Sequence, residues 1–227
     1  MKQIDSEKKL DRLKIDKLLK TIYSNNTTEE INFISNQLLQ ILDDFSEKSA
    51  YEEIRDKERW NQSHSVLITY ADSIYKNGEA TLITLRKLLS KHFGSLSKVV
   101  HILPFLKSTS DGGFAVSSYD SLEEKFGGWD DLKSISKNHD LMADLVLNHV
   151  SSSHPWVQQF IKSQEPGISN VFSPKQNLDW SNVVRPRSSS LFSQINTEDG
   201  PKQVWTTFGP DQIDLNWHNP KMTLEFL

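Results

Sequence analysis

Apolar residues in the first sixty positions recur at the spacing of an amphipathic helix. The first stripe consists of Ile15, Leu18, Leu19, Ile22 and Tyr23. The second consists of Ile31, Ile34, Leu38, Ile41, Leu42 and Phe45. Thr27 and Glu30 precede the second stripe at the spacing of a capping box, and the charged stretch 43–58 is expected to continue as helix. The pattern predicts a helical N-terminal extension over residues 1–60 that serves packing.

The pattern changes at Val66, where short apolar runs begin. These runs are VLITY (66–70), VVHIL (99–103) and LMADLVL (141–147). Their β-branched content and their length predict strands that are buried on both faces. Helical spacing over 82–93, with Gly94 as a natural stop, and over 129–139 separates them. This alternation predicts a parallel α/β architecture.

Regular periodicity fades after Val150. Residues 151–203 hold five prolines and a serine run, but they also hold Trp156, Phe160, Phe172, Trp180 and Phe192. We expect a lid-like insertion rather than disorder, because these aromatic side chains give the segment something to bury. VWTT (204–207) predicts a further strand, and MTLEFL predicts the start of a helix. The predicted organisation is therefore 1–60, 61–150, 151–203 and 204–227.

Composition narrows the class of protein. The 227 residues carry 26 Lys plus Arg and 30 Asp plus Glu, a net charge of −4, which argues against a nucleic-acid partner. The absence of cysteine excludes disulfides, Cys-ligated zinc, iron–sulfur clusters and thiol nucleophiles. The charged first residues do not resemble a secretory signal, and no apolar run approaches the ~18 residues of a membrane span. We expect a cytoplasmic protein without a membrane partner.

Candidate chemistry lies just past the predicted strands. Asp72 follows the first strand, the turn Asp111-Gly112-Gly113-Phe114 comes after the second, and Asn148 and His149 follow the third. The carboxyl ends of parallel strands meet at one rim, so these groups are expected to converge. Carboxylates accept hydrogen bonds from sugar hydroxyls, and aromatic faces cover the apolar side of a sugar ring. The set suits a polyhydroxylated ligand.

Other interpretations of the same residues remain open. An Asp beside two glycines also makes an ordinary turn, and Asn148 with His149 also makes a structural hydrogen-bond pair. His149 and His154 are possible metal ligands, but zinc sites usually show more ligands at tighter spacing. No GxxxxGK pattern is present, so Gly112 and Gly113 do not form a phosphate loop. The residues alone do not choose among these readings.

Specific strings carry a resemblance to a known family. DLVLNH (144–149) and QIDLNWHNP (212–220) resemble two signatures of the α-amylase superfamily of retaining glucosidases and transglucosidases. HILPF, SDGGF and FGGWDDL precede them in the order typical of the family. LITYAD, VVRPR and VWTTF resemble the sucrose phosphorylase branch, and most closely its glucosylglycerate phosphorylase members. The resemblance covers about residues 64–227.

The resemblance implies a fold and an activity. The fold is the N-terminal part of a (β/α)8 TIM barrel, with about three βα units and a lid-like insertion after the helical extension, and the barrel is incomplete. The activity is a retaining α-glucoside phosphorylase that transfers glucose from glucosylglycerate to inorganic phosphate and yields α-glucose 1-phosphate. Sucrose is the second candidate donor, and an amylase-like hydrolase or transglucosidase is the alternative activity. No cofactor is implied, and the oligomeric state stays open.

The resemblance also implies roles for single residues. The substrate-binding set is Asp111, Phe114, His149, Arg187, Phe208 and Gln212. Of these, Asp111 and His149 would contact the glucosyl ring, Phe114 would form an apolar platform, and Arg187 would lie near phosphate and acceptor. Phe208 and Gln212 would border the acceptor pocket. The structural set near the site is Asp144, Asn148 and Asp214, with no metal.

The catalytic pair is the main departure from the family. Retaining enzymes need a nucleophile and an acid/base carboxylate ~5–5.5 Å apart. The family carries both after the DLN signature, beyond the position of Leu227, so we expect no catalytic residue within these 227 residues. The 227-residue chain alone is therefore expected to be inactive, as the first part of an enzyme. The alternative to part of an active phosphorylase is a catalytically dead truncated fragment, vestigial or dependent on a partner, that at most binds sugar weakly.

Overall fold

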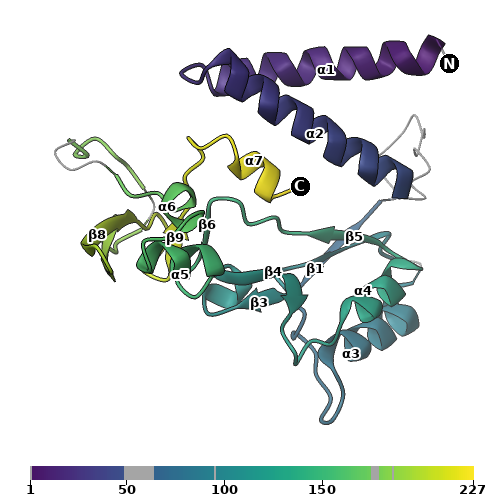
Figure 1. Cartoon of the computed structure of the whole chain (residues 1–227). Coiled ribbons are helices and arrows are strands. Elements are labelled where there is room, and N and C mark those ends of the chain that lie inside the picture. Colours follow the sequence, from purple (N-terminus) through teal and green to yellow (C-terminus); the bar gives the residue numbers. More distant parts are fainter. Residues whose placement is uncertain (1, 49–63, 95, 175–178, 186) are drawn as a thin grey trace. The chain divides into compact units, whose positions relative to one another are not determined.

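The chain divides into two compact units, which are described separately (Figure 1). One unit combines Met1–Asp56 with Asn216–Leu227 and is called the helical unit, and the other comprises Lys57–Leu215 and is called the α/β unit. The computed structural model describes residues 2–48, 64–94, 96–174, 179–185 and 187–227. Within that part of the chain, no helix is both long and apolar enough to cross a membrane.

The helical unit is built on two 21-residue helices, α1 (Lys2–Ile22) and α2 (Thr28–Lys48). The predicted capping box is confirmed, since the Thr27 amide donates to Glu30 Oε2 at 2.9 Å and the Glu30 amide donates to Thr27 Oγ1 at 3.2 Å. The predicted helix over 43–58 is confirmed as far as Lys48, and its remainder lies outside the described residues. The short helix α7 (Met222–Glu225) also belongs to this unit.

Part of each predicted stripe forms the core of the helical unit. The buried members are Leu19, Tyr23, Ile31, Ile34 and Leu38, and Ile15 and Leu224 pack against them. The Tyr23 hydroxyl lies 3.1 Å from Thr223 Oγ1, so the last residues of the sequence complete this core. Other stripe residues, such as Ile22 and Phe45, are exposed because two helices cover only one side of each other.

Three parallel strands organise the α/β unit. The sheet order is β1 (Val66–Thr69), β2 (Val99–Ile102), β5 (Asp140–Ala143), and both pairings are parallel, as predicted. The connections contain α3 (Thr81–Leu88), which continues into the π-helical turn η1 (Leu89–Phe93), and α4 (Trp129–Ser136). Leu82, Leu85 and Ile135 pack with the buried central strand β2. Gly94 ends the helix with a right-handed φ of −56°.

The prediction that all three strands are buried on both faces is wrong for β1 and β5. Ile68 on β1 is 61% exposed, and Leu141 and Met142 on β5 are each 37% exposed. The reason is their position, since β1 and β5 form the two edges of this sheet and only β2 has a neighbour on each side. The third strand is also shorter than predicted, because β5 ends at Ala143.

Two antiparallel pairs flank the sheet. β3 (Leu106–Ser108) pairs with β4 (Val116–Leu122), and the turn η2 (Asp111–Gly113) lies between them. β6 (His149–Ser151) pairs with β9 (Gln212–Asp214), which brings together two segments about sixty residues apart. The expected loop after the second strand is thus a hairpin. Its tip carries Asp111.

The predicted insertion contains regular elements. These elements are α5 (Pro155–Ile161), α6 (Gly167–Asn170), β7 (Phe192–Thr197) and β8 (Gly200–Trp205). β7 and β8 form an antiparallel hairpin, and the ring of Trp205 lies 4.9 Å from that of Trp180 and 5.2 Å from that of Phe192. These aromatic rings pack against one another and are half-buried. The β7–β8 hairpin is a regular element that the fading periodicity after Val150 did not indicate.

Candidate functional site

The site is centred on His149, the first residue of β6. Its backbone pairs with that of Asp214 on β9, and its side chain is buried. Nε2 lies 3.1 Å from the carbonyl oxygen of Phe114, and Nδ1 lies 3.3 Å from the amide nitrogen of Asn148. A carbonyl oxygen only accepts, so Nε2 carries the proton and Nδ1 accepts from Asn148. His149 is therefore a neutral imidazole with an assigned tautomer.

The electrostatics of the site favour that neutral form. Burial lowers the pKa of His149, and this outweighs the opposing effects of the Phe114 carbonyl and of the Asp214 and Asp111 carboxylates. Burial likewise raises the pKa of Asp214, although Thr207 donates two hydrogen bonds to its carboxylate, one of them from its amide at 3.1 Å. The site thus holds a neutral imidazole beside carboxylates in a partly dehydrated setting.

Gln212 joins the Asp111 turn to His149. Its Nε2 donates to Asp111 Oδ2 at 2.9 Å and lies 3.1 Å from His149 Nε2; because both of these nitrogens carry hydrogen in the assigned tautomer, the second contact is a close approach and not a hydrogen bond. Gln212 is buried at the start of β9, whereas Asp111 is exposed at the tip of its turn. A carboxylate, an amide and an imidazole therefore face one small region from three separate segments. Such a set can accept and donate hydrogen bonds to adjacent hydroxyl groups.

An aromatic ring and a cation extend this cluster. The rings of His149 and Phe208 lie 5.0 Å apart, and the guanidinium carbon of Arg187 lies 5.7 Å from the centre of the Phe208 ring. Phe208 follows β8 in the connection to β9, and Arg187 comes from the segment before β7. The structure thus brings together all six residues predicted to bind substrate, with Phe114 contributing its carbonyl oxygen.

The predicted structural residues divide into two groups. Asn148 and Asp214 lie at His149, as their pairing and hydrogen bonds show. Asp144 lies apart from this cluster, past the end of β5, and its Oδ2 is 2.9 Å from His101 Nε2 on β2. It links the two strands at their carboxyl ends.

The two histidines considered as metal ligands have other partners. His154 is buried at the start of α5, where its Nδ1 accepts from the Trp156 amide at 3.2 Å, and burial lowers its pKa to about 4. Across the described residues, no group of three or more His, Asp or Glu side chains is placed to hold a metal ion.

Sequence reasoning missed two residues that support the site. Arg185 donates to the carbonyl oxygens of Thr206 and Thr207, at 3.1 and 2.6 Å, and so attaches the Arg187 segment to the connection that carries Phe208. Asp211 accepts hydrogen bonds from Thr109, Ser110 and Ser152. The available signal for Asp211 was the two hydroxyl-rich stretches 108–110 and 151–153, whose donors need an acceptor.

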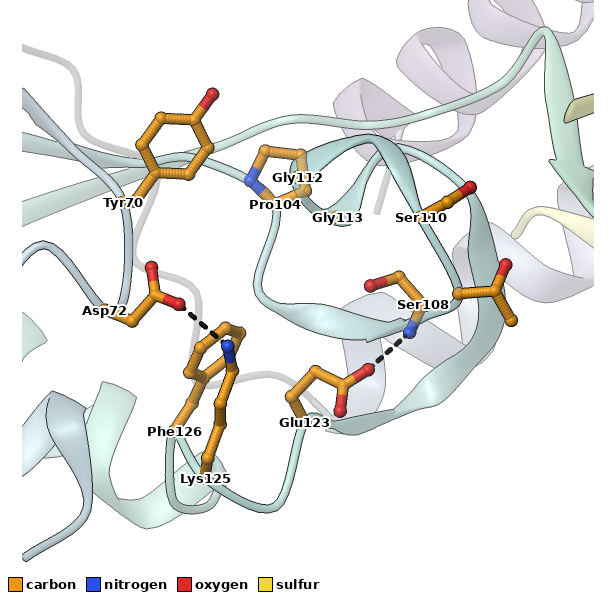
Figure 2. A pocket seen from close by; sticks show the side chains of 11 residues that line it. Tyr70, Asp72, Pro104, Ser108, Ser110, Gly112, Gly113, Glu123, Lys125 and Phe126 are labelled. Carbon is orange, nitrogen blue, oxygen red and sulfur yellow. Dashed lines mark hydrogen bonds and ion pairs between the residues drawn. The ribbon is translucent and has the colours of Figure 1, made fainter. Parts of the chain in front are cut away.

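A cavity of about 330 Å³ lies on the Tyr70 side of the Asp111–Gly113 turn (Figure 2). Figure 2 shows that charged groups in it are paired with protein atoms. Lys125 Nζ lies 2.8 Å from Asp72 Oδ2, and Glu123 Oε1 accepts from the Ser108 amide at 2.8 Å. These pairings tie the β1 and β3 ends to the segment before α4.

Comparisons with known proteins place the chain in a family. The chain matches the family described as the alpha-amylase catalytic domain over residues 92–227. A glucosylglycerate phosphorylase of Allomeiothermus silvanus is 41% identical over 168 residues, which cover 74% of this chain and 30% of that protein. A sucrose phosphorylase of Streptococcus mutans is 32% identical over 174 residues, which cover 72% of this chain and 35% of that protein.

A solved structure resembles the chain as well. It is the sucrose 6F-phosphate phosphorylase from Thermoanaerobacter thermosaccharolyticum, with a TM-score of 0.64 and 32% identity over 74% of this chain and 37% of that one. The chain spans about a third of the length of these relatives.

Proposed function

Because this chain belongs to the α-amylase catalytic-domain family, we propose that it forms the glucosyl-binding part of a glucoside phosphorylase. Its fold is the expected one, part of a TIM barrel, in which the described strands β1, β2 and β5 form an open parallel sheet. The observation that carries the proposal is the Asp111–Gln212–His149 cluster with Phe208 and Arg187 beside it.

Each side chain has a task that fits its chemistry. Asp111 accepts hydrogen bonds from a pair of hydroxyls on the glucosyl ring, and neutral His149 donates through Nε2 to a further hydroxyl in place of the Phe114 carbonyl. Phe208 offers an apolar face to the acceptor side. The guanidinium of Arg187 stays charged at working pH and matches the geometry of phosphate. Gln212 orients Asp111 toward the sugar.

We infer glucosylglycerate as the donor and sucrose as the second candidate. The support is the similarity to glucosylglycerate phosphorylases at 41% and 40% identity, against 32% for a sucrose phosphorylase. A carboxylate nucleophile would break the glucosidic bond and form a glucosyl-enzyme, and phosphate would then release α-glucose 1-phosphate with retention. A cytoplasmic location belongs to the same proposal, because an enzyme that consumes inorganic phosphate works where phosphate is supplied.

The nucleophile and the acid/base are not among the site residues of this chain. We therefore propose that a polypeptide of only these 227 residues binds glucosides weakly and does not turn them over. Inorganic phosphate and an α-glucoside are the proposed partners of the active enzyme, and no nucleic acid or membrane takes part.

The test is phosphate-dependent release of glucose 1-phosphate. The complete product of the reading frame that encodes these residues is incubated with glucosylglycerate or sucrose, with and without phosphate. We expect release from glucosylglycerate only with phosphate. The rate should be strongly lowered but still measurable in Asp111→Asn and unchanged in Asp130→Asn, which changes an exposed carboxylate on α4. Equal release of free glucose with and without phosphate would show that the enzyme is a hydrolase and not a phosphorylase.

A further inference from the structure

Asp211 is a hydrogen-bond hub directly beside the site. Its Oδ2 accepts from Thr109 Oγ1 at 2.6 Å and from Ser110 Oγ at 2.5 Å. Its Oδ1 accepts from the hydroxyl of Ser152 and, at 3.2 Å, from the Ser152 amide. One carboxylate therefore ties the entry of the η2 turn to the end of β6, and both of its oxygens are used.

The turn that Asp211 holds has a costly backbone. Asp111 has a φ of 54°, a left-handed conformation that is uncommon for residues other than glycine, and Gly112 and Gly113 follow at 62° and 106°. The exposed tip is braced mainly by backbone bonds such as Phe114 N to Asp111 O at 3.2 Å and Gly113 N to Ser110 O at 3.3 Å. A strained conformation persists only where its surroundings fix it.

Asp211 and Gln212 act on this turn from adjacent positions. Asp211 holds Thr109 and Ser110, and Gln212 holds the carboxylate of Asp111 itself. The same two residues also reach β6, because Asp211 accepts from Ser152 and Gln212 lies against His149. The dipeptide therefore bridges the turn and β6, beside the contacts of the Phe114 carbonyl oxygen with His149 Nε2 and of Thr109 with Ser151.

We propose that Asp211 is a positioning residue that fixes the Asp111 turn at the distance from His149 needed to bind the glucosyl ring. The functional half of this inference rests on the proposed function, whereas the structural half does not. The low pKa of the Asp211 carboxyl is consistent with it: burial opposes the charge, but hydrogen bonds from Ser110, Ser152 and Thr109 outweigh burial and lower the pKa. The carboxylate is thus ionised, and both oxygens accept at neutral pH.

The first experiment needs no activity. Amide hydrogen exchange is followed by mass spectrometry in the complete reading-frame product and in Asp211→Asn. An asparagine presents an NH2 group to one of the two donor pairs, so one pair is lost. We expect exchange over 109–115 to rise about 10- to 100-fold, the factor for losing hydrogen bonds to a charged group. Exchange in α3 and α4 should not change.

Two further variants make this experiment decisive. Asp199→Asn is the matched control, because Asp199 is an exposed carboxylate in the β7–β8 turn and is paired with Lys202. It should leave exchange over 109–115 at the wild-type rate. Ser110→Ala removes a single donor and should raise exchange over 109–115 a few-fold. It takes the place of Asp211→Asn if that variant does not fold. Unchanged exchange over 109–115 in Asp211→Asn, or in Ser110→Ala where the former does not fold, would overturn the proposal, as would an equal rise over the entire chain.

The second experiment tests how Asp211 acts on substrate. A double-mutant cycle of Asp211→Asn with Asp111→Asn is read as kcat/KM for glucosylglycerate phosphorolysis. Because Asp211 acts through Asp111, we expect Asp211→Asn to cost about 10- to 100-fold in the wild-type background and less than threefold in Asp111→Asn. Additive losses would contradict the positioning role. A wild-type protein without phosphorolysis would instead refute the proposed function and leave the exchange result to decide the structural claim.

Discussion

At the scale of single residues, two arginines two positions apart have different environments. Arg185 is half-buried and donates to the carbonyl oxygens of Thr206 and Thr207. Arg187 is exposed, and its guanidinium lies over the ring of Phe208. Arg185 therefore anchors the segment, whereas the exposed charge of Arg187 fits its proposed role in recognition of an anion.

We expect Arg187→Ala to lower kcat/KM for phosphate about 10- to 150-fold in the active enzyme, because a hydrogen bond to a charged group contributes ~1.5–3 kcal/mol. Glucosyl-enzyme formation without phosphate should fall for glucosylglycerate, whose carboxylate needs a cation, and not for sucrose. Single-turnover glucosylation measures this. Arg185→Ala is the control, since it should lower the rate of glucosyl-enzyme formation from both donors alike. An equal fall in this rate for both donors in Arg187→Ala would contradict anion recognition.

His154 should make stability depend on pH. Its pKa is about 4 in the folded protein and near 6.5 when exposed, so the unfolded chain binds more protons between these values. The contribution is present in full above about pH 6.5 and is lost as the pH falls toward 4. The difference of about 2.5 pKa units corresponds to about 3 kcal/mol. Urea unfolding at pH 7 and pH 4.5 measures the free energy of unfolding.

His154→Asn isolates this effect. Asparagine can still accept from the Trp156 amide as an N-cap, but it does not titrate. We expect the loss of stability between pH 7 and 4.5 to shrink by about 2–3 kcal/mol relative to wild type. His92→Asn, at an exposed histidine, should keep the wild-type pH dependence. An unchanged pH dependence in His154→Asn would refute the argument.

Some of the residue-scale geometry was accessible from the sequence. The motif strings carried Asp111, His149 and Gln212, and the structure places Gln212 Nε2 2.9 Å from Asp111 Oδ2 and 3.1 Å from His149 Nε2. Their contacts with substrate stay a prediction. Asp211 was missed because its hydroxyl donors lie about 60 and 100 positions away, so no pattern near Asp211 marks it. Arg185 was missed because it donates to backbone carbonyl oxygens, which every residue has.

At the scale of elements, the β3–β4 hairpin depends on the close approach of Gly113 to Pro104, which lies just past the end of β2. A Cβ atom at Gly113 would lie 2.5 Å from the carbonyl oxygen of Pro104, and its φ is +106°. Gly200, in the β7–β8 turn, has a φ of +105° with nothing within 4 Å of such a Cβ. At both positions a residue with a Cβ would adopt the positive φ only under strain. Only at Gly113 is there no space for that Cβ.

We expect Gly113→Ala to destabilise the protein by more than Gly200→Ala. Each substitution costs about 1–3 kcal/mol for the left-handed backbone, and only Gly113→Ala adds a clash with the backbone of Pro104. Thermal melts of both variants measure the difference. Equal losses would show that the turn moves away from Pro104 without penalty.

Hydrophobic patterning predicted the parallel strands and their helices but overestimated burial. Short apolar runs identify a strand, but they do not say whether a neighbour covers each face. The pattern therefore predicted burial for Leu141 and Met142, which are exposed. The β3–β4 hairpin was missed because VSSYDSL (116–122) places serines at successive positions instead of alternating with apolar residues.

At the scale of the whole molecule, the open edge of the sheet matters most for a polypeptide of only these 227 residues. β5 is an outer strand, and Met142 lines an apolar cavity of about 320 Å³ with Phe105, Trp129 and Leu132. Unpaired strand edges promote association. We expect this polypeptide to self-associate at micromolar concentration and to melt over a broad range, as measured by sedimentation velocity and calorimetry.

Met142→Lys should reduce the associated fraction several-fold, because a lysine on an edge strand opposes edge-to-edge pairing. Leu145→Lys is the matched control, since Leu145 is 67% exposed but lies outside the strand. A monomeric wild-type polypeptide with a sharp two-state transition would contradict this account of the open edge.

The Tyr23–Thr223 hydrogen bond also has a consequence for synthesis. It joins residues 200 positions apart, and Leu224 packs on the same core of α1 and α2. Ribosomes add ~5–20 residues per second, so the N-terminal hairpin waits about 10–40 s before the segment that completes its core emerges. During that interval the α/β unit is translated in full, while the hairpin that preceded it remains a nascent-chain surface accessible to chaperones.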